Sequence, residues 1–132
     1  MNCLLDTHAF LWAVFAPGKL SRKARTAIAD TGNSVHLSSV TLWEISLKYA
    51  LGKLALTDCT PETLLVTARD MGLALIAPDA DESANFYRLP RLPHRDPFDR
   101  MLVWQAIQRD LMLITKDSAL PDYRAAGLKT LW

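Results

Sequence analysis

Short apolar runs alternate with segments of helical character along this chain, and that alternation limits what it can fold into. The runs NCLLD, SVHLS, LALIA and LMLIT occupy residues 2–6, 34–38, 73–77 and 111–115. Strands separated by helices are typical of a sheet covered on both faces. We therefore predict a single α/β domain over residues 1–132, with three layers and a mostly parallel central sheet flanked by helices.

Local signals predict where individual elements begin. Asp96 precedes Pro97, and proline is favoured at the first position of a helix, so Asp96 is the expected N-cap. Asp99 then falls in the first turn of that helix. Segment 40–51 has apolar residues on most sides, which indicates a largely buried helix. Residues 128–132, LKTLW, are expected to form an edge strand.

Composition excludes several classes of protein. Half of the residues are hydrophobic, 22% are charged and the formal net charge is +1, so a nucleic acid would have to be met by local basic patches. The isolated Cys3 and Cys59 indicate a reduced, cytoplasmic setting without disulfides or a zinc site. Asp6 interrupts the first apolar run, which is atypical of a signal peptide. The sequence contains no apolar run long enough to span a membrane.

Acidic residues follow several of the predicted strands. Asp6 ends the first apolar run, and Asp117 comes two residues after LMLIT. Glu44 lies early in the helix after SVHLS, and Asp99 begins the helix that leads into LMLIT. Because loops at the carboxyl ends of parallel strands form the ligand crevice, these four side chains could converge there.

Each acid also has a purely local interpretation. Asp6, Asp99 and Asp117 could cap a helix or turn, and Glu44 could pair with Lys48 four residues later. Carboxylates gathered in one cleft, however, repel one another unless a cation joins them. Oxygen ligands favour Mg²⁺ or Mn²⁺, and such an ion can activate water for phosphodiester hydrolysis.

Basic residues lie close to these acids in the sequence. A solvated charged loop is one interpretation; beside an acidic metal cleft, the same residues could hold a nucleic-acid backbone. His8 and His94 are interpreted as structural or substrate-facing residues rather than metal ligands. The predicted substrate-binding residues are Arg91, Arg95, Arg100 and Lys116.

The segments LLDTHAFLW, SSVTLWEISLK, RDPFDRMLVWQA and LMLITKD together resemble the PIN-domain ribonucleases, in particular the VapC-type toxins of prokaryotic toxin–antitoxin modules. The order and spacing of the four acids agree with that family. The resemblance implies that Asp6, Glu44, Asp99 and Asp117 are catalytic and bind Mg²⁺ or Mn²⁺, with Thr7 and Thr115 as supporting hydroxyls. It also implies endoribonuclease activity on RNA, a homodimer, and inhibition by a small antitoxin encoded alongside. The apolar helices at 7–12 and 40–51 could form part of the antitoxin groove.

One departure from the family pattern is visible, and three alternatives stay open. The family often has small residues where this chain has Val103 and Trp104. An aspartyl-phosphate phosphatase would need an acid at position 8, which is His8. A receiver-like signalling module would need an acid after SVHLS, where none occurs. A PIN-like domain that binds RNA without cutting it is the third alternative, and metal-dependent cleavage would discriminate it.

Overall fold

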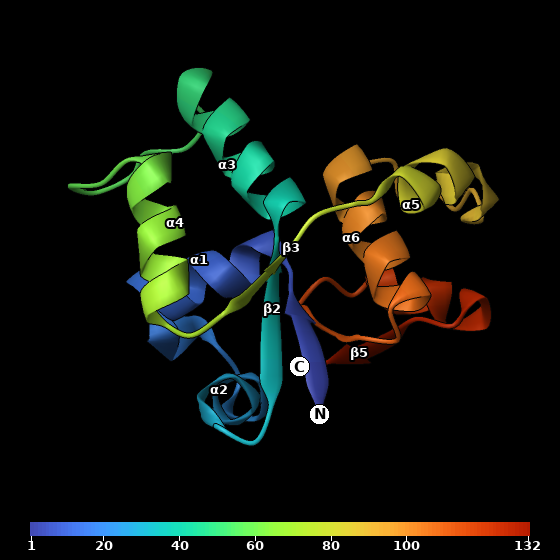
Figure 1. Cartoon of the computed structure of the whole chain (residues 1–132), viewed down its shortest axis with the longest axis horizontal. Helices are drawn as coiled ribbons and strands as arrows, with labels where there is room; N and C mark the ends of the chain where they lie inside the picture. The colour runs from blue at the N-terminus through green and yellow to red at the C-terminus, as the bar shows by residue number, and fades with distance from the viewer.

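The computed structural model describes all 132 residues as an α/β fold built on one five-stranded sheet (Figure 1). The strand order is β3-β2-β1-β4-β5, and every neighbouring pair is parallel. The predicted α/β class is confirmed, and the sheet is wholly rather than mostly parallel. The predicted edge strand is confirmed as β5. The strands are β1 (Asn2–Leu5), β2 (Ser34–Ser38), β3 (Ala74–Ile76), β4 (Met112–Ile114) and β5 (Lys129–Leu131).

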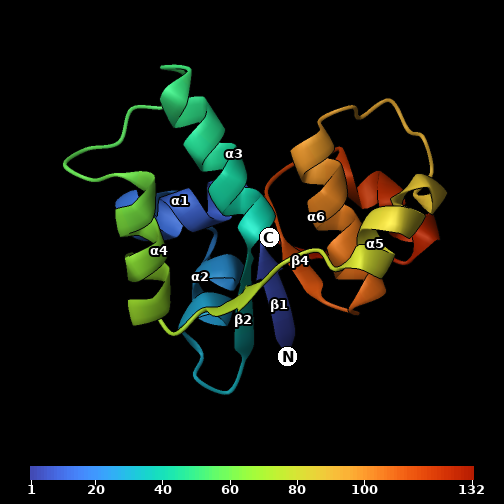
Figure 2. The same cartoon turned by 45° about the horizontal axis from the view of Figure 1, so that its top comes forward.

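Helices cover both faces of this sheet. In Figures 1 and 2, α1, α2 and α4 lie on one side of the central strands, and α5 and α6 lie on the other. No helix has both the length and the hydrophobicity needed to cross a membrane. The helices are α1 (Thr7–Phe15), α2 (Arg22–Ala29), α3 (Ser39–Ala50), α4 (Pro61–Asp70), α5 (Ala80–Asn85) and α6 (Pro97–Gln108).

Two hydrophobic cores result from the alternation of side chains along β1. Cys3 and Leu5 point into the core shared with α1, α2 and α4, whereas Leu4 points into the core shared with α6. All three side chains are fully buried. Because successive strand residues face opposite sides, a strand buried on both faces has a continuous apolar sequence rather than an alternating one.

Side-chain caps determine where the helices nearest the sheet edge begin. Asp6 caps α1 by accepting a hydrogen bond from the Ala9 amide, and Ser38 caps α3 in the same way. Asp96 caps α6, with Oδ1 accepting from the amides of Phe98 and Asp99. The predicted cap at Asp96 is therefore confirmed, and Asp99 lies in the first turn of α6.

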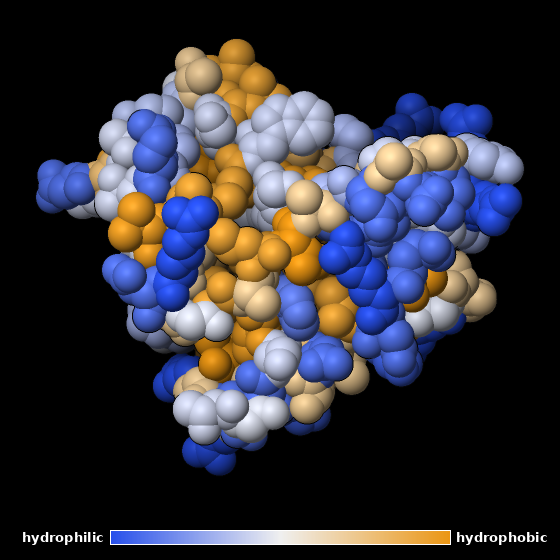
Figure 3. Space-filling model, viewed as in Figure 1, coloured by the Kyte–Doolittle hydropathy of each residue, from blue (hydrophilic) through white to orange (hydrophobic).

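The expectation that the helix at 40–51 is largely buried is wrong. Val40 and Ile45 of α3 are buried, but Trp43 is 64% exposed and Leu47 is 40% exposed. Figure 3 shows hydrophobic surface around α3 and beside α4, while hydrophilic residues cover most of the α5 side. Apolar residues on most sides of a helix do not distinguish burial inside the fold from an apolar face left open to a partner.

Trp104, where the sequence departs from the family pattern, holds α6 against α5. Its side chain is buried, and Nε1 donates to the carbonyl oxygen of Glu82 and to Oδ1 of Asn85. Glu82 also accepts two hydrogen bonds from the Arg109 guanidinium, at 2.9 and 2.6 Å. The bulk of Trp104 thus fills the contact between two helices without reaching the acids.

We expect Arg109→Met to destabilise the protein by about 2–3 kcal/mol at pH 7, because it leaves the buried Glu82 carboxylate unpaired. The hydrogen bonds from Arg109 hold the pKa of Glu82 below its ordinary value. A lowered pKa stabilises the fold above the unfolded-state pKa, and that stabilisation disappears as the pH falls through the folded-state pKa. Urea unfolding at pH 7 and pH 3 measures both effects.

The matched control is the double variant Glu82→Gln/Arg109→Met, which removes the buried charge together with its partner. It should recover part of the lost stability. An unchanged free energy of unfolding in Arg109→Met at pH 7 would contradict a structural role for this ion pair.

Candidate metal centre

Pairing between β1 and β4 brings two of the predicted acids to one edge of the sheet. Leu5 is in register with Ile114, and the Asp6 amide donates to the Ile114 carbonyl oxygen at 3.1 Å. The chain continues from each strand directly into Asp6 and into the loop that carries Asp117. Both residues line one cavity of about 430 Å³ together with Asp99.

Asp6 is the most buried acid in this cavity, with 6% of its surface exposed. Burial raises the pKa of its carboxyl group because the charged form loses its water, and the nearby Asp117 acts in the same direction. The Thr115 hydroxyl and the Ala9 amide lower that pKa through hydrogen bonds. One carboxylate thus serves as a helix cap and as part of the cavity wall.

Asp99 also has a perturbed pKa. Burial raises its pKa to about 6, and the negative charges of Asp96 and Glu44 contribute. His94 acts in the opposite direction, with Nε2 lying 3.0 Å from Asp99 Oδ2. A carboxyl group that resists ionisation in a cleft is a candidate for binding a cation, which would favour the charged form.

Glu44 is buried, but it is not among the residues that line the cavity. Its Oε1 accepts a hydrogen bond from the Thr7 hydroxyl at 2.6 Å, and its Oε2 accepts one from Lys48 at 2.5 Å. The local pairing with Lys48 therefore exists, yet it involves a side chain that is 3% exposed rather than one on an open helix surface. The negative charge of Glu44 contributes to the raised pKa of Asp99.

Threonine hydroxyls connect these acids to the sheet. Thr7 contacts both Glu44 and Thr41, the latter at 3.2 Å between the hydroxyl oxygens. Thr115 accepts a hydrogen bond from the Asp117 amide at 3.1 Å, which holds the turn after β4. Sequence analysis identified Thr7 and Thr115 but missed Thr41, which lies one helical turn before Glu44.

The basic residues divide between two surfaces. Arg91 and Arg95 are exposed and line a cavity of about 600 Å³ with Arg100. Arg100 is already engaged: its guanidinium donates to the carbonyl oxygens of Leu89 and Pro90 and to the Tyr123 hydroxyl. Lys116 instead lines the acidic cavity.

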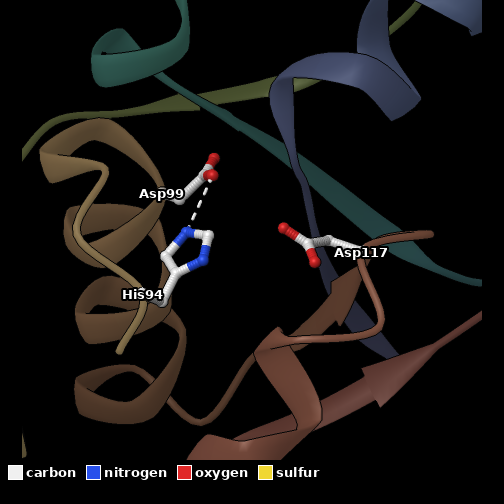
Figure 4. Close-up of side chains that lie close together, drawn as sticks. All are labelled: His94, Asp99 and Asp117. Carbon is white, nitrogen blue, oxygen red and sulfur yellow. Dashed lines mark hydrogen bonds and ion pairs between the residues drawn. The ribbon is translucent and has the colours of Figure 1, made fainter. Parts of the chain in front are cut away.

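His94 is the residue that sequence analysis undervalued. His94, Asp99 and Asp117 each offer one ligand atom, and these atoms all lie within 4.8 Å of one another. Figure 4 shows their side chains converging from the loop before α6, from α6 itself and from the loop after β4. The sequence signal was weak, because a histidine five residues before an acid in a proline-containing loop has no regular spacing that would predict contact.

The donor set fits a divalent cation. Asp6, Asp99 and Asp117 supply carboxylate oxygens to one cavity, and a bound positive charge would offset the burial that raises the pKa of Asp6 and of Asp99. Three of the four predicted acids thus line the cavity, whereas Glu44 does not and is joined through Thr7 to the residue next to Asp6.

Comparison with known proteins identifies the family of this chain. The PIN domain family model matches residues 3–126. Ribonuclease VapC22 of Mycobacterium tuberculosis (strain ATCC 25618 / H37Rv) is 26% identical over 129 residues, covering 98% of this chain and 97% of that protein. Among solved structures, the DNA-bound VapBC2 of Rickettsia felis has a TM-score of 0.70 at 16% identity, covering 99% of this chain and 98% of that one. VapBC-5 of Mycobacterium tuberculosis, a toxin–antitoxin system, has a TM-score of 0.58 at 18% identity, covering 98% and 95%. With the family model spanning nearly the whole sequence, this chain belongs to the PIN domain family.

Proposed function

We propose that this chain is a metal-dependent endoribonuclease and the toxin of a toxin–antitoxin pair. The observation that carries the proposal is the cavity lined by Asp6, Asp99 and Asp117, which come from three separate segments of a PIN domain. The matching relative named as a ribonuclease supports RNA as the substrate. The alternatives of a phosphatase or a receiver module lack support, because position 8 holds a histidine and no aspartate directly follows β2.

We assign metal binding to the carboxylates of Asp6, Glu44, Asp99 and Asp117, with Mg²⁺ or Mn²⁺ as the ion. A bound divalent cation supplies a water of lowered pKa as nucleophile and neutralises the phosphate. Glu44 is included because its charge reaches Asp99 and because Thr7 and Lys48 hold it in one position. Thr115 fixes the turn that carries Asp117.

Substrate binding is assigned to the basic residues on either side of the acids. Arg91 and Arg95 are exposed and free to pair with phosphates, and Lys116 lies at the acidic cavity itself. Arg100 serves through the loop it holds, since its donors are directed to carbonyl oxygens and to the Tyr123 hydroxyl. RNA would thus lie across the loop before α6 with a phosphate directed toward the acids.

Cleavage of RNA should require Mg²⁺ or Mn²⁺ and stop in excess chelator. If activated water attacks the phosphorus and the 3′-oxygen leaves, the products carry 5′-phosphates and 3′-hydroxyls, and we expect these ends. Glu44→Gln removes one of the four assigned ligand carboxylates and should lower the cleavage rate by at least about 10- to 100-fold, the range for residues that only orient metal ligands. Cleavage in the presence of chelator, or products ending in 2′,3′-cyclic phosphates, would contradict the proposal. Metal binding without any cleavage would instead favour the alternative of a PIN-like domain that only binds RNA.

Asp96 and Asp99 should respond differently to substitution. Asp96→Ser keeps a capping oxygen and should retain most cleavage, whereas Asp96→Ala should lose about 1 kcal/mol of stability. Asp99→Asn should fold, bind the metal weakly and barely cut RNA. If Asp96→Ser failed to cleave RNA and Asp99→Asn cleaved it in the same assay, the roles of helix cap and metal ligand would have been assigned to the wrong aspartates.

The stability of Asp99→Asn provides an independent check of this assignment. The folded pKa of Asp99 is about 6, above its ordinary 3.8, so ionised Asp99 destabilises the metal-free fold at pH 7 and this cost disappears as the pH falls toward 4. Metal-free Asp99→Asn should therefore be more stable than the wild type by roughly 3 kcal/mol at pH 7, and close to it at pH 4. If Asp99→Asn and the wild type were equally stable at both pH values, ionisation of Asp99 would not destabilise the fold, and the argument would be contradicted.

We place the antitoxin in an apolar cavity of about 560 Å³ between α1 and the loop at 54–57. His8 and Trp12 line both this cavity and the acidic one, so a peptide bound there could direct a basic side chain to the acids. The resemblance to a solved toxin–antitoxin complex supports such a partner. The exposed apolar face of α3, which includes Trp43 and Leu47, is the surface we assign to contact between two copies of the chain.

Phe15→Asp introduces a charge into the α1 cavity and should weaken binding of the antitoxin encoded beside this gene by tenfold or more, while RNA cleavage by the free protein stays intact. The control is Val66→Asp, a charge at an equally exposed apolar position on α4, outside the cavity. Calorimetry with the purified antitoxin measures the affinity of each variant. Equal affinities for the two variants would exclude this cavity as the binding site.

A further inference from the structure

His94 occupies a position that the proposed four-acid site does not explain. It lies in the loop before α6, with a side chain that is 17% exposed, and lines the basic cavity beside Arg91 and Arg95. Its Nε2 nevertheless contacts Asp99, and one of its ring nitrogens belongs to the group of ligand atoms shared with Asp99 and Asp117 (Figure 4). The ring therefore stands between the basic loop and the acids.

We propose that His94 is a direct metal ligand alongside Asp99 and Asp117, so that this site holds Mn²⁺ in preference to Mg²⁺. The inference rests on the metal site of the proposed function and adds a nitrogen donor to it. It also replaces the sequence-based interpretation of His94 as a structural or substrate-facing residue.

Spacing supports direct ligation. Metal–ligand bonds of roughly 2.1 Å put neighbouring donors of an octahedron about 3 Å apart and opposite donors about 4.2 Å apart. The His94 Nε2 to Asp99 Oδ2 distance is 3.0 Å, and the atoms of all three residues lie within 4.8 Å of one another. The three side chains are therefore spaced nearly as the donors around one ion, without a rearrangement of the loop.

The nitrogen donor is the reason for the choice of ion. Mg²⁺ takes oxygen ligands almost exclusively and keeps much of its water, whereas transition ions also bond imidazole. Of the two ions that the carboxylates favour, Mn²⁺ is the transition ion. A mixed set of one imidazole and several carboxylates should therefore discriminate against Mg²⁺.

Pulsed electron paramagnetic resonance on the full chain loaded with Mn²⁺ tests the ligand directly, since electron spin-echo envelope modulation detects a coordinated ¹⁴N nucleus. The protein is prepared without a histidine tag. The wild type should show coupling to an imidazole nitrogen, and His94→Gln should abolish it. The matched control is His8→Gln, which removes the histidine that lines the acidic cavity itself but does not belong to the group of His94, Asp99 and Asp117, and should leave the coupling unchanged.

A second variant covers the case in which His94→Gln no longer holds Mn²⁺. His94→Asp exchanges the nitrogen for an oxygen donor, so it should bind Mn²⁺ without ¹⁴N coupling. Its preference for Mn²⁺ over Mg²⁺, measured as the ratio of the two dissociation constants by calorimetry, should fall by about tenfold or more. No ¹⁴N coupling in the wild type, or coupling that persists in His94→Gln, would overturn the proposal, as would an unchanged metal preference in His94→Asp.

The measurement separates this inference from the proposed function, because it contains no RNA. Nitrogen coupling in a protein that fails to cut RNA would support the His94 ligand and refute the nuclease. Metal-dependent cleavage by a protein whose Mn²⁺ shows no nitrogen coupling would support the nuclease and refute the ligand.

Discussion

The parallel pairing of β1 with β4 is the constraint on which the rest of the site depends. These strands are far apart in the sequence, yet the register of Leu5 with Ile114 makes both strands end at the same edge of the sheet. The Asp6 amide extends the pairing by one hydrogen bond to the Ile114 carbonyl. A shift of one residue in this register would turn Asp6 away from the cavity and an apolar neighbour toward it. The hydrophobic cores on both faces of β1 therefore fix the position of a carboxylate as firmly as they fix the fold.

Burying carboxylates costs free energy, and the chain offsets that cost with polar groups drawn from its own caps and turns. Asp6 and Asp99 both lie at helix N-termini, where the amide dipoles favour negative charge. Glu44, buried behind them, is paired with Thr7 and Lys48. The offset is incomplete at Asp99, whose pKa remains near 6. The incomplete offset matters because a site that fully stabilised its carboxylates would leave little for a cation to gain.

The parts of the fold that could be predicted from the sequence are those with local causes. The cap at Asp96 depends on residues within one helical turn, and the strand LMLIT depends on its own apolar run, so both were predicted correctly. The acids could be predicted to share one edge because parallel strands end together. The exposure of Trp43 could not be predicted. An apolar helix surface has the same sequence pattern whether it packs against the rest of the fold or against a partner protein.

Contacts across the tertiary structure set the limit for the site residues. Arg100 and Arg95 are both arginines near the acids, and only the fold shows that Arg100 donates to Leu89 and Pro90 while Arg95 stays exposed. Thr41 was missed for the same reason, because its partner Thr7 is distant in the sequence. His94 contacts the nearby Asp99, but its approach to Asp117 also depends on the tertiary fold. The types of residue predicted the chemistry of the site. The tertiary fold decides which arginine, threonine or histidine lies at it.

Helix capping alone does not separate a structural aspartate from a metal-binding one. Asp6 and Asp96 are both N-caps, so a carboxylate that turns back to its own helix can still line a cavity. The difference lies in how many amides the carboxylate accepts and in whether it borders the cavity. Asp6 uses Oδ1 for a single amide and borders the cavity, whereas Oδ1 of Asp96 receives two amides and Asp96 lies outside the cavity lining. In α6 the two roles are divided between neighbouring acids, with Asp96 ordering the first turn and Asp99 facing the cavity from it. In α1 a single residue, Asp6, fills both, so in the proposed metal site it is the position where stability and metal binding should be hardest to change independently.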